Sequence, residues 1–72
     1  DSSARLRYLD AVLAIDPDDI YLRAMRAMVH YGERRFDDAL ADIEILLKEN
    51  PDGPETAPLR DIRDRLRAMK KE

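Results

Sequence analysis

The sequence predicts an all-α fold of four antiparallel helices, and two observations lead to this prediction. A block of apolar residues with its closing Pro-Asp pair occurs twice, and every matched pair lies 34 positions apart. The first copy is Leu6, Leu9, Val12, Leu13, Pro17 and Asp18, and the second is Leu40, Ile43, Leu46, Leu47, Pro51 and Asp52. Apolar residues also recur every three or four positions, as on one face of a helix, and no segment alternates as a strand does. A fixed period of this length is typical of helix-turn-helix repeats, which bury their apolar faces by stacking.

The first two predicted helices are separated by an acidic run that contains a proline. The first helix starts at the serines of positions 2 and 3, either of which can cap it, and ends before Asp16-Pro17 because proline cannot continue a helix. The second runs from about Asp18 to Tyr31, and the acidic run at its start supplies a cap and places acids at the favourable end of the helix dipole. It stops at Gly32, a suitable residue just past a helix because it tolerates positive φ.

The third and fourth predicted helices are separated by the turn-forming residues 50–54, which include two prolines. The third helix, near 36–48, has the clearest amphipathic pattern, with one face formed by Phe36, Ala39, Leu40, Ile43, Leu46 and Leu47. The fourth begins near 56–58, and its apolar stripe is Leu59, Ile62, Leu66 and Met69.

Length and composition limit the chain to one small domain, residues 1–72, with a thin core. Its start at Asp1 without a methionine leads us to expect a fragment or C-terminal part of a longer protein. Its apolar runs are far shorter than the roughly 20 residues of a membrane-spanning helix, so we expect a soluble protein without a membrane partner. The lack of cysteine leaves the compartment unknown, with the cytoplasm as the default expectation.

Charge argues against nucleic acid as the partner. The net charge is −3 and the pI is about 5.1, whereas phosphate binding usually needs a clustered basic surface. Only residues 58–72 carry an excess of basic side chains.

Residues suited to catalysis are scarce. His30 is the only histidine and there is no cysteine, so neither a thiolate nor a two-histidine metal site can form. We therefore expect a surface histidine, no metal, no cofactor and no enzymatic activity. No hydroxyl lies in a nucleophile-elbow context, and neither glycine belongs to a phosphate-binding loop.

A family resemblance lies on the third predicted helix and just after it, in Phe36, Ala39, Leu40, Ile43 and Pro51. This pattern resembles the second helix of a tetratricopeptide (TPR) repeat, although Leu46 stands where that family usually has alanine. The first predicted helix is similar to the second helix of a preceding unit, and the fourth to the first helix of a following unit. The resemblance implies a right-handed stack of one full unit and two half-units, and a scaffold for protein-protein interaction.

The register of the second helix is the weakest part of this resemblance. An unbroken register would place Ala27 at the family's small-residue position, but it would also place Arg23, Arg26 and His30 at buried positions. Burying three such groups would cost on the order of several kcal/mol. We therefore expect a helix shifted two residues earlier, followed by a longer turn over 32–35. The residues that this shift turns inward are Tyr21, Ala24, Met25 and Met28.

A basic stripe on the fourth helix suggests a binding site for a peptide. Its members are Arg60, Arg63, Arg67 and Lys70. Arg26 precedes Arg60 by 34 residues, and the first-type helices of TPR units line their ligand groove. We therefore expect an acidic or C-terminal peptide in the groove of the second and fourth helices, bound by Leu22, Arg26, Val29, Arg60, Arg63 and Arg67. The alternative is a solvated face, partly paired with neighbouring acids such as Asp61 and Asp64.

The first helix is apolar on a second side, through Tyr8, Ala11, Val12 and Ile15. Such a helix usually lies between neighbours. The neighbour would be the first helix of its own unit or another copy that self-associates through Tyr8, Val12 and Ile15; otherwise Tyr8 is simply exposed. The leading functional hypothesis is an interaction module, and the alternative is a structural accessory segment that packs on an upstream catalytic domain.

Overall fold

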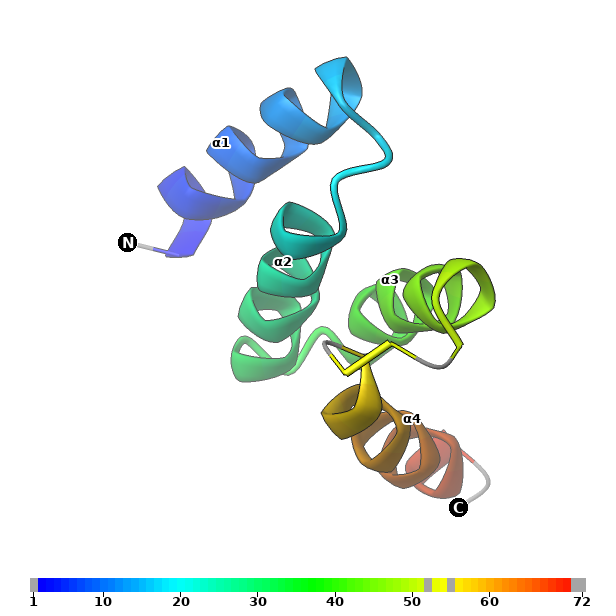
Figure 1. Cartoon of the computed structure of the whole chain (residues 1–72). Helices are drawn as coiled ribbons and strands as arrows, with labels where there is room; N and C mark the ends of the chain where they lie inside the picture. The colour runs from blue at the N-terminus through cyan, green and yellow to red at the C-terminus, as the bar shows by residue number, and fades with distance from the viewer. Residues whose placement is uncertain (1, 52, 55, 71–72) are drawn as a thin grey trace.

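The computed structural model describes residues 2–51, 53–54 and 56–70, which form four α-helices and no strand. The helices are α1 (Ser2–Ile15), α2 (Ile20–Gly32), α3 (Phe36–Glu49) and α4 (Ala57–Lys70) (Figure 1). The all-α prediction is confirmed, and each helix begins and ends close to its expected position. Each helix packs on its neighbour along the chain, so that α2 lies against both α1 and α3, and α3 against both α2 and α4.

Side-chain hydrogen bonds fix two of the helix starts. Asp19 caps α2, as expected from the acidic run, because its Oδ1 accepts the Leu22 backbone N–H at 3.0 Å. Thr56 is buried just before α4, and its Oγ1 donates to the Asn50 carbonyl at 2.6 Å. The second bond closes the turn after α3, which holds the start of α4 against the end of α3.

The hydrophobic core repeats with the sequence. Leu6, Leu9 and Leu13 of α1 are buried, and so are their counterparts 34 residues later on α3. The main core joins α2, α3 and α4 and consists of Ala27, Ala39, Leu40, Ile43, Leu46, Leu47, Leu59 and Leu66. The sequence repeat is therefore also a repeat of buried positions.

The expected two-residue shift of α2 is wrong. Ala27 is fully buried at 0% exposure, whereas Tyr21, Met25 and Met28 are exposed at 66%, 51% and 44%. Of the residues expected to face inward, Ala24 alone packs against the core. The unbroken register is the one adopted, because the arginines that it turns toward α3 meet a buried carboxylate there.

The turn between α2 and α3 also differs from the expectation. Gly32 is the last residue of α2 and does not have positive φ. The left-handed conformation belongs instead to Arg34, with φ of 61°. Glu33 and Arg34 donate their backbone N–H groups to the last carbonyls of α2, which closes the helix. The turn therefore spans only 33–35 and stores strain at a non-glycine residue.

Replacing Arg34 by glycine should stabilise the protein, because glycine adopts positive φ without a Cβ clash. We expect an increase of about 0.5–1 kcal/mol in the free energy of unfolding, measured by urea denaturation. Arg34→Ala is the matched control, since it removes the same side chain but keeps the strained conformation, and it should give no gain. Equal stability of the glycine and alanine variants would contradict this reading of the turn.

Candidate functional site

A buried carboxylate on α3 organises the contact between α2 and α3. Asp42 is 4% exposed and accepts two hydrogen bonds from one guanidinium group. Arg26 donates Nε–H to Oδ2 at 2.8 Å and Nη2–H to Oδ1 at 2.7 Å, the bidentate geometry of a strong ion pair. Arg23 adds a longer contact of 3.4 Å from Nη1 to Oδ1. Both arginine side chains are largely buried, at 20% and 13% exposure.

The same guanidinium group reaches the first helix. Arg26 Nη1 donates to Asp10 Oδ1 at 2.9 Å, so one side chain links α1, α2 and α3. The hydrogen bonding that Arg26 donates to Asp42 raises the pKa of Arg26, while partial burial acts in the opposite direction. A group whose pKa is raised on folding contributes stability at every pH below its unfolded pKa. The Arg26 ion pair therefore stabilises the fold throughout the neutral range. Arg23 Nη2 also donates to the Pro17 carbonyl at 2.7 Å, which ties the loop before α2 to the same cluster.

No partner for these arginines was expected from the sequence, although the position of Asp42 on α3 indicates one. Asp42 follows Ala39 by three residues and precedes Leu46 by four, so it lies on the buried face of its own helix. A carboxylate on a buried face requires a cationic partner, which the two arginines of α2 provide.

The predicted peptide site is divided between two environments. Arg26 is bound by Asp42 and Asp10 and is therefore not available as a peptide anchor. Leu22 and Val29 are partly buried. Among the residues that the structure describes, α2 and α4 each pack on α3 and not directly on each other.

The basic stripe of α4 lies beside acids contributed by α3 as well as by α4 itself. Arg67 is 3.5 Å from Glu44, Lys70 is 3.0 Å from Asp37, and Arg63 is 3.2 Å from Asp64. All three pairs are at least partly exposed, and such pairs contribute about 0–1 kcal/mol each. Arg60 is exposed as well. The side chains of the stripe can therefore exchange their present partners for those of a ligand at small cost.

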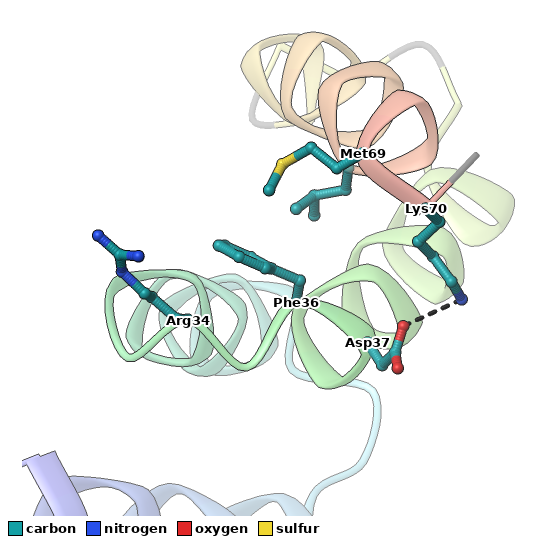
Figure 2. Close-up of a pocket in the computed structure, with 6 residues that line it drawn as sticks. Arg34, Phe36, Asp37, Met69 and Lys70 are labelled. Atoms are coloured by element: carbon teal, nitrogen blue, oxygen red, sulfur yellow. Dashed lines mark ion pairs between the residues drawn. The ribbon is translucent and has the colours of Figure 1, made fainter. Parts of the chain in front are cut away.

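An open hollow lies between the first turn of α3 and the end of α4. Figure 2 shows Phe36 and Met69 extending into this hollow from the two helices, with the Lys70–Asp37 ion pair at one end. Leu66 forms part of its floor and Arg34 lies at the opposite end. The hollow is small and partly apolar, and it extends the stripe with a surface on which an apolar side chain can rest.

A second open groove lies between α1 and α2. Its lining residues are Ser2, Arg5, Met25, Met28, Val29, Gly32 and Glu33. The second apolar side of α1, expected from the sequence, is uncovered next to it, with Tyr8 at 65% and Ile15 at 86% exposure.

His30 is only partly exposed and therefore differs from the expected surface histidine. Its Nδ1 atom is buried and makes no hydrogen bond. The described part of the chain contains no group of three or more side chains able to hold a metal ion. In the same residues, no helix is both long and apolar enough to cross a membrane.

Comparison of the chain with protein-family models, with curated proteins and with solved structures gives no match. Functional inference therefore depends on the geometry of the chain itself.

Asp42→Asn should destabilise the protein strongly, because it leaves the largely buried Arg23 without a carboxylate and leaves Arg26 with the exposed Asp10 alone. We expect a loss of about 2–3 kcal/mol in the free energy of unfolding, somewhat below the roughly 3–5 kcal/mol of a fully buried pair. Glu44→Gln is the matched control: it neutralises an acid of the same helix that pairs with an exposed arginine, and should cost at most about 1 kcal/mol. Similar losses in the two variants would contradict the central role of Asp42.

Proposed function

We propose that this chain is a non-enzymatic protein-interaction module of the helical-repeat class, resembling TPR repeats. One observation carries the proposal: matched positions 34 residues apart are buried in both copies of the repeat. Units of this kind bury their faces only against neighbours, and the stacked helices present extended surfaces to other proteins.

The basic stripe of α4 supports an acidic segment of a protein as the ligand. Arg60, Arg63 and Arg67 follow one another along one side of the helix, and guanidinium groups bind carboxylates in bidentate fashion. The acids that pair with Arg67 and Arg63, Glu44 and Asp64, are exposed, so a ligand carboxylate replaces contacts of low energy there. Arg26 takes no part in this reduced site, since its guanidinium group is held by Asp42.

A second candidate is a structural role, in which the chain packs permanently on a catalytic domain of a parent protein. The exposed apolar side of α1 favours this candidate, because such a side is suited to permanent burial. The two functions differ in their readout. An interaction module binds its ligand reversibly as an isolated chain, whereas an accessory segment stabilises the domain on which it packs.

Changing Arg63 and Arg67 together to alanine should weaken binding of an acidic peptide. A glutamate-rich peptide with a free C-terminal carboxylate is the probe, titrated by calorimetry at low and at high salt. We expect affinity to fall with salt and to drop by about tenfold in the double variant, as two contacts of about 0.5–1 kcal/mol each are lost.

Changing Arg7 and Arg35 together to alanine is the control, because both are exposed and lie outside α4 and outside the groove between α1 and α2. This variant has the same net charge as the first and should bind the peptide as the unmodified chain does. Equal affinity in the two double variants would contradict the site on α4. Chemical-shift changes around Asp38 of α3 would place the ligand elsewhere.

A further inference from the structure

The open groove between α1 and α2 has a filled counterpart elsewhere in the molecule. For five of its seven lining residues, the residue 34 positions later in the sequence belongs to the main core or packs against it. Ser2, Arg5, Met25, Met28 and Gly32 correspond to Phe36, Ala39, Leu59, Ile62 and Leu66. The groove of the first copy therefore occupies the place that is core in the second.

In the second copy of the repeat, helix α2 covers the surface that corresponds to the open groove. It contacts α3 through the ion pair of Arg26 with Asp42, and through Tyr31, whose ring meets Phe36 edge-to-face at 5.8 Å between centroids. Ala27 and Tyr31 belong to or pack against the same core as Leu59 and Leu66. No described helix of the chain stands in this relation to α1.

The equivalent helices α3 and α1 differ in exposure on the side where α2 lies against α3. On α3 the side toward α2 is fully covered, with Ala39, Asp42 and Leu46 at 0%, 4% and 1% exposure. On α1 the equivalent residues are Arg5 and Tyr8, which are exposed, and Val12, which is partly buried. The other side is buried on both helices. One missing neighbour therefore accounts for both the groove and the apolar side of α1.

We propose that this surface binds an amphipathic helix of a separate protein, lying on α1 as α2 lies on α3. The inference rests on the interaction function proposed above and assigns it a second, apolar site. The bound helix carries a small residue and, four positions later, an aromatic one, as α2 does in Ala27 and Tyr31. It has no arginine opposite Tyr8, because Tyr8 replaces Asp42, and it offers a carboxylate to Arg5.

A second copy of the chain does not fit this site by the same packing. The helix equivalent to α2 is α4, in which Asp61 stands at the position of Ala27 and Arg65 at that of Tyr31. Both are exposed and charged. Packing this side of α4 on the apolar side of α1 would take two charged side chains out of water against apolar residues, which is costly.

A synthetic helix derived from α2 tests the site directly. The probe has the sequence of residues 18–33 with three substitutions. Arg23→Leu and Arg26→Leu remove the charges that would face Tyr8, and His30→Glu supplies a carboxylate for Arg5. The control peptide has the sequence of residues 56–70, in which Asp61 and Arg65 stand at the positions of Ala27 and Tyr31. We expect the probe alone to bind, with chemical-shift changes at Tyr8 and Met25 of the full chain.

Gly32→Leu separates docking in the groove from folding. A Cβ added at Gly32 meets no atom within 4 Å, and the residue lies in a helix without positive φ, so the fold tolerates the substitution. The new side chain fills the groove and should weaken probe binding at least tenfold, with no loss in melting temperature. Ala68→Leu adds the same side chain at an exposed position of α4, outside the groove, and should leave binding unchanged.

Three results would overturn the proposal. The first is probe binding that Gly32→Leu does not affect. The second is a set of shift changes confined to Arg60, Arg63 and Arg67, which would leave the interaction function intact and remove only this site. The third is a dimer in sedimentation velocity that Tyr8→Ser dissociates, because a second copy would then cover α1. Failure of the glutamate-rich peptide to bind would instead count against the proposed function, independently of this groove.

Discussion

The ion pair between Asp42 and Arg26 is the contact on which the arrangement of the helices depends. A carboxylate that is 4% exposed is tolerated only with a charged partner in good geometry, and the bidentate contact of 2.7 and 2.8 Å supplies it. For Arg26 to reach Asp42, α2 must present Ala27 to the core. The small side chain of Ala27 then lets α2 approach α3 closely, and Asp10 extends the same network to α1.

This rotation of α2 also decides which surfaces are available for binding. With Ala27 inward, Met25 and Met28 lie on the opposite side and line the groove beside α1. The buried ion pair therefore leaves an apolar surface of α2 exposed to solvent. Arg26, which the sequence favoured as a ligand anchor, holds the helices together, whereas Arg63 and Arg67 of α4 pair with exposed acids that a ligand can replace.

The sequence predicted what depends on local chemistry. The helices, the breaks at Pro17 and after Asn50, and the cap at Asp19 follow from periodicity and from the conformations of single residues. The register of α2 could not be found in this way, because it depends on Asp42, which lies 16 positions from Arg26 along the chain. Counting the free-energy cost of burying the arginines without that partner led to the wrong inward face of α2.

The same limitation explains two further errors. The acids of α4 were weighed against its basic side chains, but Glu44 and Asp37 reach Arg67 and Lys70 from α3, and only the packing of the two helices brings them together. The positive φ was assigned to Gly32 because glycine accepts it most easily, yet the helix continues one residue further and Arg34 takes that conformation. Each error came from a contact or a boundary that the tertiary structure determines.

Cysteine labelling is the most direct test of the register that the Asp42 pair imposes. The chain has no native cysteine, so Met25→Cys and Ala27→Cys each report on one position of α2. We expect a thiol at position 25 to react about as fast as one in a free peptide. A thiol at position 27 should react slower by about two orders of magnitude or more, since it must wait for local opening of the helix. Protection at position 25 with rapid reaction at position 27 would contradict this register.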